Sequence, residues 1–468
     1  MILSLLLACA GHKDGDSAAT DYGAWLLPLP AGFPTPKVPI DNDATPEKFD
    51  FGRYLFYDAR LSGNATQSCS DCHIASLSFS DGLVTPTGSS GDAVPRNSLA
   101  LVNTAWEETY TWPDPLLTTL EDQVKAPMFG SNPAELDMTG HEDEIVTRLK
   151  ADPTLVSLGA AAFPDDDPFS DDSLIKTLAT YIRGLISSDS PYDRFTSTGD
   201  ASGMSDSARR GEGLFFGETA DCYHCHQAPN FTVSYTSQES AGAQDAFFNT
   251  GLYNTDGNGA YPPDNQGLYA ITGIASDMGR FRAPTLRNIA LTAPYMHDGS
   301  VATLEDVVDI YNRGGRDVTS GPYTGDGATN PYKNNLVRAL NLSDQDKADL
   351  VAFMESLTDQ TFLSNTDYLA PPSASCPDDI PGSCPSTVPS YAADVAPILT
   401  SVCAPCHVSG GSAYASYDFE SYASVAANES AILDAMSTCH MPPAVSPQLT
   451  DEQRATLLAW LVCGSPDN

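Results

Sequence analysis

Short amphipathic segments recur along the chain, separated by long polar stretches rich in Gly, Pro, Ser and Asp. Residues 49–57, with the sequence Phe-Asp-Phe-Gly-Arg-Tyr-Leu-Phe-Tyr, place apolar side chains on one face of a helix, and the polar residues 62–67 follow. Segments 211–216 and 391–399 have the same character. We therefore expect an opening helix at each of these three places.

A second set of three segments shows the same helical spacing further along. Its apolar positions are Leu174, Leu178, Tyr181, Ile182 and Leu185, then Leu342, Leu350, Phe353, Met354 and Leu357, then Leu449, Leu457, Leu458 and Leu461. Ser343-Asp344 and Thr450-Asp451 mark the starts of the last two, because Ser or Thr followed by Asp is typical of a capped helix start. Each segment is predicted to be a closing helix.

Between each opening and closing helix lies the pattern Cys-x-x-Cys-His. It occurs as Cys69, Cys72 and His73, as Cys222, Cys225 and His226, and as Cys403, Cys406 and His407. Two thiols one helical turn apart can add to the two vinyl groups of one porphyrin, and the adjacent histidine can bind its iron. One such motif also fits a zinc half-site or a redox dithiol. Three, each without a second cysteine pair, indicate three covalently attached c-type haems.

The order helix, haem motif, loop, helix, repeated three times, predicts an all-α fold of three cytochrome c-like haem domains in tandem with long loops. We expect haem domains over 21–200, 201–365 and 391–468, with a Pro-rich linker over 366–390. Residues 1–20 form a predicted signal and tether. Their apolar run ends in Leu-Leu-Ala-Cys at Cys9, which resembles the lipobox of bacterial lipoproteins, although an ordinary secretory leader stays open.

Charge narrows the choice of partners. The 468 residues include 61 acidic and 23 basic side chains, giving a formal net charge of −38. This excess makes nucleic acid and anionic membrane surfaces poor partners, so that any membrane contact is expected only through a lipid anchor at Cys9. A basic redox protein would be attracted to such a surface, although the same acidity also keeps a secreted protein soluble.

The remaining cysteines point to an oxidising compartment. Of the eleven cysteines in the chain, the haem motifs use six. We expect Cys376 to pair with Cys384 and Cys439 to pair with Cys463, because these are the neighbouring pairs. Haem attachment of this type also occurs outside the cytoplasm. The predicted location is periplasmic or anchored to the outer membrane of a Gram-negative-type bacterium.

Motifs in the first 365 residues run in a recognisable order. They are Gly52-Arg53-Tyr54-Leu55-Phe56, Arg60-Leu61-Ser62, Phe79-Ser80-Asp81-Gly82, Pro95-Arg96-Asn97, Gly279-Arg280-Phe281-Arg282-Ala283-Pro284-Thr285-Leu286-Arg287-Asn288 and Leu291-Thr292-Ala293-Pro294-Tyr295-Met296-His297-Asp298-Gly299. In this order they resemble the bacterial dihaem cytochrome c peroxidase and MauG superfamily. The C-terminal haem domain is an addition to that pattern.

The resemblance implies that the His73 haem reacts with hydrogen peroxide. In the family's peroxidases a histidine about sixteen residues past the proximal one blocks the sixth iron position, and this chain has Ser89 there. The iron is therefore expected to be open, as in MauG-like members, with His141 as the alternative blocking ligand. Glu135 matches the family's proton-transferring glutamate and Gln123 its polar companion, although surface solvation of Glu135 is a competing interpretation.

The resemblance also implies groups between the first two haems. Trp112 falls where the family has its inter-haem tryptophan, fifteen residues after Asn97, but its flanks differ from the family's, and Trp106 is the runner-up. Core packing stays open for either indole. Asn97, Thr292 and Pro294 fall at the family's calcium site, where one side chain and two main-chain carbonyls supply oxygen ligands.

The distal ligands of the other two haems follow from position. Tyr311, nineteen residues after Thr292, occupies the place of the methionine of the family's peroxidases and the tyrosine of MauG-type enzymes. Met278 and Met296 are alternatives, and Tyr311 could instead be a core aromatic. In the C-terminal domain Met441 has the Met-Pro setting of small cytochromes c, with His440 as the alternative.

Three functions are compatible with these features. The first is a peroxidase that reduces hydrogen peroxide at the His73 haem, with electrons relayed through the second and third haems from a small cytochrome c or cupredoxin. The second is MauG-like oxidation of Trp or Tyr residues in a partner protein. The third is a multihaem electron conduit without enzymatic activity. We place peroxidase activity in the broad sense first.

Overall fold

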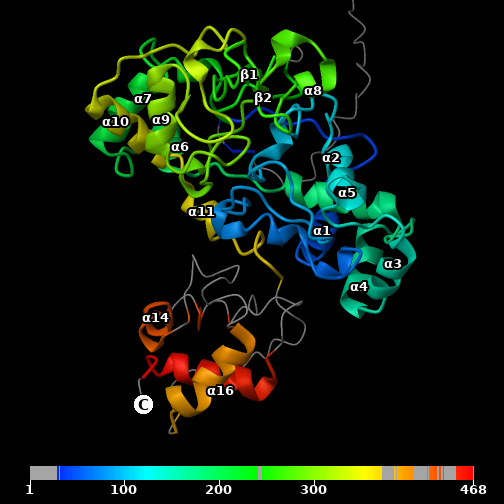
Figure 1. The fold of residues 1–468 in the computed structure, drawn as a ribbon. Coiled ribbons are helices and arrows are strands. Elements are labelled where there is room, and N and C mark those ends of the chain that lie inside the picture. Colours follow the sequence, from blue (N-terminus) through cyan, green and yellow to red (C-terminus); the bar gives the residue numbers. More distant parts are fainter. Residues whose placement is uncertain are drawn as a thin grey trace, which may run out of the picture.

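The structure is a computed structural model that describes residues 29–30, 32–240, 245–371, 384–385, 387–403, 419, 421–429, 432–433, 436 and 449–466. Helices dominate this part of the chain, and the strands form two short antiparallel pairs (Figure 1). The all-α expectation is confirmed at this level. No helix within the described ranges combines the length and apolar character needed to cross a bilayer.

The first group of helices surrounds the first haem motif. It comprises α1 (Pro46–Phe56), α2 (Leu120–Phe129), α3 (Glu142–Lys150), α4 (Pro153–Ala162) and α5 (Asp171–Arg183). Thr45 caps α1 by accepting from the Lys48 N–H, and Ser170 caps α5 by accepting from the Ser173 N–H. The predicted opening and closing helices of this domain are therefore present, and they pack against each other.

The second group surrounds the second haem motif. It comprises α6 (Pro191–Thr198), α7 (Asp206–Phe215), α8 (Tyr269–Thr272), α9 (Leu304–Arg313), α10 (Asp344–Glu355) and α11 (Gln360–Leu363). The strand β1 (Phe247–Asn249) pairs with β2 (Arg280–Arg282), with Phe248 opposite Phe281, and β3 (Asp317–Val318) pairs with β4 (Gly325–Asp326). Figure 1 shows this group, in green and yellow, beside the blue and cyan first group.

A glycine lies at the crossing of the opening and closing helices in both groups. A Cβ on Gly52 of α1 would lie 2.2 Å from the Thr177 carbonyl oxygen of α5. A Cβ on Gly211 of α7 would lie 1.9 Å from the Asp349 carbonyl oxygen of α10. The two helix pairs therefore approach so closely that no side chain fits, which explains why both opening helices carry glycine at this position.

Buried apolar side chains form three main clusters, one in each part of the chain. The first extends from Phe49 to Leu185, the second from Tyr192 to Leu357, and the third from Val395 to Leu461. Phe362 of α11 belongs to the first cluster, although it lies at the end of the second haem domain in sequence. The end of the second domain thus packs back on the first and joins the two.

The C-terminal part is helical where it is described. It contains two π-helical segments, η9 (Tyr391–Val395) and η10 (Leu399–Cys403), on either side of α12 (Ala396–Ile398), followed by α14 (Tyr422–Ala427) and α16 (Asp451–Val462). Ser343 and Thr450 cap α10 and α16 in capping boxes, as their sequence predicts. In Figure 1 α14 and α16 lie apart from the first two groups.

The expected disulfide pairing is wrong. Cys384 pairs with Cys463, 79 positions away, so neither the Cys376–Cys384 bridge nor the Cys439–Cys463 bridge forms. The prediction paired cysteines that are close in sequence, but Cys463 at the C-terminal end of α16 lies next to Cys384 of the linker in space. The bridge therefore ties the linker to the closing helix of the tail instead of forming a small loop within the linker. Cys9, Cys376, Cys406, His407, Cys439, His440 and Met441 lie outside the described residues.

Candidate active site

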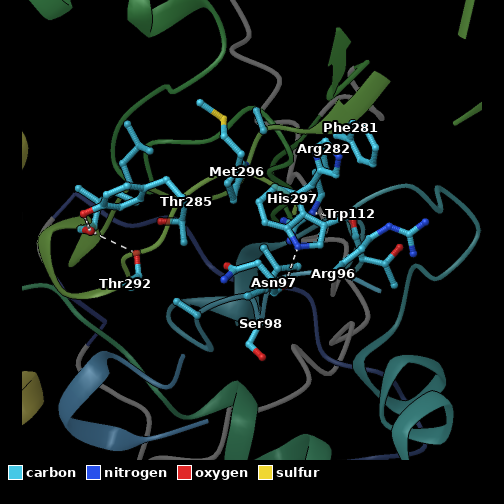
Figure 2. A pocket seen from close by; sticks show the side chains of 18 of the residues that line it. Arg96, Asn97, Ser98, Trp112, Phe281, Arg282, Thr285, Thr292, Met296 and His297 are labelled. Carbon is cyan, nitrogen blue, oxygen red and sulfur yellow. Dashed lines mark hydrogen bonds between the residues drawn. The ribbon is translucent and has the colours of Figure 1, made fainter. Parts of the chain in front are cut away.

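One continuous cavity is lined by the first two haem motifs. Its wall includes Cys69, Cys72 and His73 from the first motif and Cys222, Cys225 and His226 from the second. Each motif begins with a short 3-10 turn, η2 (Cys69–Asp71) and η5 (Cys222–His224). Figure 2 shows the part of the wall formed by residues 96–98, Trp112, the end of β2 and residues 292–297.

Main-chain carbonyls hold the ring of each histidine. His73 Nδ1 lies 2.7 Å from the Phe79 oxygen. His226 Nδ1 lies 3.0 Å from the Phe231 oxygen and 3.2 Å from the Pro284 oxygen. Because a carbonyl can only accept, both Nδ1 atoms carry the proton, which leaves each Nε2 as the nitrogen that can bind a metal. Burial lowers the pKa of both imidazoles, which favours the neutral, ligating form.

The two motifs fit covalently attached haem. The four thiols are free, and each pair lines the cavity with its own histidine. Burial raises the pKa of Cys69 and Cys222 to about 12, so these sulfurs lie in an environment that disfavours a charged thiolate. Neutral thioether links to haem suit such an environment. Cys69, Cys72 and His73 would hold the first haem, and Cys222, Cys225 and His226 the second.

Glu135 lies in a loop that two neighbouring segments, residues 88–89 and Gly63, hold in place. Its carbonyl accepts a 2.7 Å hydrogen bond from the Ser89 N–H, and the next carbonyl, of Leu136, accepts from the Gly63 N–H at 2.8 Å. A Cβ on Gly88 would lie 2.1 Å from the Ala134 oxygen, so residues 88–89 pack directly on this loop. The backbone that carries Glu135 is therefore fixed before any ligand binds.

The Glu135 side chain lines the cavity near the first motif. Burial raises the pKa of this carboxyl, so it can hold a proton closer to neutral pH than an exposed glutamate can. Gln123 of α2 also lines the cavity, and its buried Oε1 accepts no hydrogen bond from the described residues. The structure thus places the predicted pair on the same cavity wall, with one free acceptor.

The two candidate blocking residues lie elsewhere. Neither Ser89 nor His141 lines the cavity. Ser89 contacts the backbone of Glu135 and its hydroxyl is buried without a partner among the described residues. His141 precedes α3, with its ring near Glu144 and about half of its side chain exposed.

The structure distinguishes the two tryptophan candidates. Trp112 lines the cavity between the motifs, and its Nε1 donates to the Asn97 carbonyl at 2.8 Å. Trp106 is fully buried away from the cavity, where it packs on Phe33 and donates to the Pro34 carbonyl. Trp106 is therefore a core residue, and Trp112 is the one of the two indoles that lines the cavity shared by the haem motifs.

The three predicted calcium ligands surround the same region. Asn97, Thr292 and Pro294 all line the cavity, and Figure 2 shows the first two. The Asn97 amide nitrogen donates to the Leu83 carbonyl at 2.7 Å, which leaves its Oδ1 facing elsewhere. Within the described residues, this oxygen and the carbonyls of Thr292 and Pro294 accept no hydrogen bond. Three unused oxygens of these types are compatible with a hard cation.

Tyr311 of α9 lies near the second motif. Its side chain lines the cavity, burial raises the pKa of its phenol, and Cys225 and Cys222 are close enough to raise it further. Of the two methionine alternatives, Met296 lines the cavity and Met278 does not.

Two further residues face the cavity that the sequence did not single out for a role. Arg96 and His297 both line it, and Arg96 Nε and His297 Nε2 are buried without a hydrogen-bond partner among the described residues. Burial lowers the pKa of His297 to about 4, Asp298 opposes this shift, and the Arg96 charge adds to it. Both residues belong to recognisable motifs, but only the folded chain shows that these two nitrogens lack hydrogen-bond partners.

Comparisons with known proteins agree with this site. The family model for di-haem cytochrome c peroxidase matches residues 46–202. The chain is 33% identical over 352 residues to methylamine utilization protein MauG of Methylorubrum extorquens, covering 75% of this chain and 89% of that protein. It is 34% identical over 375 residues to cytochrome-c peroxidase IdrP1 of Pseudomonas sp. strain SCT, covering 76% and 92%.

A solved structure extends the likeness to the fold. The crystal structure of a MauG-like protein associated with microbial copper homeostasis has 46% sequence identity to this chain and a TM-score of 0.73, and the match covers 74% of this chain and 99% of that one. Members of this family are oxidoreductases with two covalently bound c-type haems, which the two motifs in the cavity accommodate. The chain therefore belongs to the bacterial di-haem cytochrome c peroxidase and MauG family.

Proposed function

We propose that this protein reduces hydrogen peroxide at the haem held by His73, whose iron has no protein ligand on its sixth position. The observation that carries the proposal is that Glu135 lines the cavity with His73, whereas neither Ser89 nor His141 does. The residue at the place of the blocking histidine does not line the cavity and a carboxyl group does, which supports an open sixth position at this haem.

The residues near the first motif provide proton transfer. The bound haem supplies a redox-active iron, through which peroxide can accept electrons. Overall, hydrogen peroxide takes up two electrons and two protons, its O–O bond breaks, and two water molecules leave. The Glu135 carboxylate accepts the proton of one peroxide oxygen and returns it to the other, which departs as water. The free Oε1 of Gln123 accepts a hydrogen bond from the peroxide and orients it.

Tyr311 is the proposed distal ligand of the second haem. A phenolate is a hard anionic ligand that stabilises ferric iron and lowers the reduction potential, whereas a methionine thioether raises it. Its position beside Cys222 and Cys225 supports this role better than that of Met278, which lies off the cavity. The same cavity holds the proposed calcium ligands Asn97, Thr292 and Pro294, and metal analysis before and after dialysis against a chelator tests for one calcium ion.

Electrons come from an external donor. The net charge of −38 favours a basic small cytochrome c or cupredoxin. The C-terminal domain with the predicted ligands His407 and Met441 is the proposed entry point. Replacing Cys403 and Cys406 together by Ala is expected to slow turnover with a protein donor while sparing turnover with a small chemical reductant. Equal loss with both reductants would contradict this role.

Oxidation of a partner protein is the second candidate. Tyr311 at the second haem and 46% identity to a MauG-like protein favour it. In this reaction the two electrons come from Trp or Tyr side chains of the partner instead of a reduced donor. Because that relative is associated with microbial copper homeostasis, a copper-homeostasis protein is the first substrate class to test.

Steady-state kinetics separate these functions. We expect sustained oxidation of reduced small cytochrome c by the wild type, and a loss of about 10²–10⁴-fold in Glu135→Gln. Glu142→Gln is the matched control, because Glu142 is a carboxyl at the start of α3 that does not line the cavity. Unchanged turnover in Glu135→Gln contradicts the proposal. The second candidate is favoured if the protein does not oxidise the donor. In that case peroxide should lower the mass of a partner protein, because its Trp or Tyr side chains lose hydrogen atoms.

A further inference from the structure

The cavity between the two haem motifs contains a half-buried arginine, Arg96, that has no carboxylate partner among the described residues. Arg96 lines this cavity, and no hydrogen bond or ion pair joins its guanidinium to any described residue. Figure 2 shows Arg96 near Trp112 and His297 in this cavity. Its pattern of five N–H donors is suited to a carboxylate.

The three most deeply buried arginines of the described residues are compensated. Each has a carboxylate partner: Arg183 with Glu121, Arg282 with Glu107, and Arg287 with Asp193. Arg96 is half-buried, its Nε is buried without a partner, and leaving such a donor unpaired is unfavourable. Acidic side chains outnumber basic ones in this chain by 61 to 23, so a carboxylate partner from the chain would have been available. The missing counter-ion of Arg96 is therefore most simply supplied by a bound group.

His297 offers a second polar atom in the same region. Its ring stacks on Phe281 with 3.5 Å between centroids and lies 6.4 Å from the Trp112 ring, so its orientation is fixed. The buried Nε2 has no partner among the described residues, and the Arg96 charge reaches this imidazole. Two unpartnered nitrogens thus lie near each other on one cavity wall.

We propose that Arg96 and His297 together bind a propionate carboxylate of one of the two haems. Each haem carries propionates, and its vinyl side is fixed by the cysteines of its motif. The assignment rests on haem in this cavity and not on the proposed peroxide chemistry. A propionate held here would lie near Trp112, whose ring is 6.4 Å from that of His297, so the same pair would help to position that haem.

The charge of Arg96 then tunes one haem. A cation at the propionate stabilises the reduced, less positive haem, so its removal lowers the midpoint potential of that haem. The other haem, whose propionates have other neighbours, is expected to change less.

Spectroelectrochemical titration of the full, haem-loaded protein tests this assignment. We expect Arg96→Gln to lower the midpoint potential of one haem by several times the change in Arg209→Gln, and to shift the propionate bands in its resonance Raman spectrum. Arg209 is the matched control because it pairs with Asp206 on the exposed face of α7. His297→Gln is expected to shift the Raman bands of the same haem.

Two outcomes overturn the proposal. One is unchanged potentials and propionate bands in an Arg96→Gln protein that retains both haems, and the other is an equal fall in Arg209→Gln. If Arg96→Gln does not retain both haems, Arg96→Lys takes its place, because it keeps the charge but loses the forked geometry that binds a carboxylate. A smaller shift at the same haem supports the assignment and unchanged bands overturn it. None of these readouts depends on peroxide turnover.

Discussion

The indole nitrogen of Trp112 donates a 2.8 Å hydrogen bond to the main-chain carbonyl of Asn97. The Asn97 N–H in turn donates to the His297 carbonyl at 2.9 Å, and the Arg282 N–H donates to the Trp112 carbonyl at 2.8 Å. Segments from both haem domains therefore fix this indole. A rigid aromatic ring between two haem motifs is a suitable element for electron exchange between them.

Replacing Trp112 tests this role. We expect Trp112→Phe to slow electron exchange between the first two haems by about tenfold or more, equivalent to a barrier increase of about 1.4 kcal/mol, because the shorter ring loses both reach and its hydrogen bond. Stopped-flow spectra of each haem after rapid mixing with reductant measure the rate. Trp106→Phe is the control, since Trp106 donates to Pro34 in the core and is expected to leave this rate unchanged. Equal slowing in both variants contradicts the assignment.

Tyr311 is expected to set the potential of the second haem. Tyr311→Met replaces a hard anionic ligand by a thioether, so the midpoint potential should rise. Met296→Leu serves as the control, because Met296 lines the same cavity but is not the proposed ligand. Spectroelectrochemical measurement of the midpoint potential of the second haem in both variants decides whether Tyr311 or Met296 is the ligand. A shift in Met296→Leu with none in Tyr311→Met identifies Met296 as the ligand.

The rate of the peroxide reaction should have an acid limb. Burial raises the pKa of Glu135 above its ordinary value of 4.5, and the reaction starts with its carboxylate accepting a proton. The rate of the peroxide reaction is therefore maximal above the raised pKa of Glu135 and falls as the pH drops through it. Stopped-flow rates between about pH 4 and pH 8 measure this limb. The same limb in Glu135→Gln would show that another group is titrating.

Close packing of α7 on α10 predicts a difference between two glycines of the same helix. Gly211→Ala introduces a Cβ 1.9 Å from the Asp349 carbonyl oxygen, so the free energy of unfolding should fall by about 1–3 kcal/mol or more. A Cβ on Gly213 meets no atom within 4 Å, so Gly213→Ala should stabilise the helix by about 0.5–1 kcal/mol. Denaturant unfolding followed by the haem spectrum measures both. Equal effects would show that helix propensity, and not the crossing, determines stability.

Much of the fold could be predicted from local pattern. Ser343 and Thr450 start their helices as predicted because capping depends on a few neighbouring residues. The spacing of Cys69, Cys72 and His73 is likewise a local property. The Cys384–Cys463 disulfide was missed because it depends on where α16 ends in space.

The site shows the same division. Motif position pointed to Glu135, Gln123 and Trp112, and all three line one cavity. That Trp106 lies in the core and does not line this cavity could be seen only from the packing of the folded chain. The carbonyls of Phe79 and Phe231 that orient the two histidines give no sequence signal, since every residue has a carbonyl. The unpaired state of Arg96 is also a property of the folded chain alone.

An electron paramagnetic resonance spectrum of the fully oxidised protein tests the open iron at His73 most directly. We expect a high-spin ferric signal from the His73 haem, together with low-spin signals from six-coordinate haem. Hydrogen peroxide added to this resting form should remove the high-spin signal. Low-spin signals from every haem, in a protein whose haem content is complete, would show that a side chain fills the sixth position, and electron carriage would then be the remaining function.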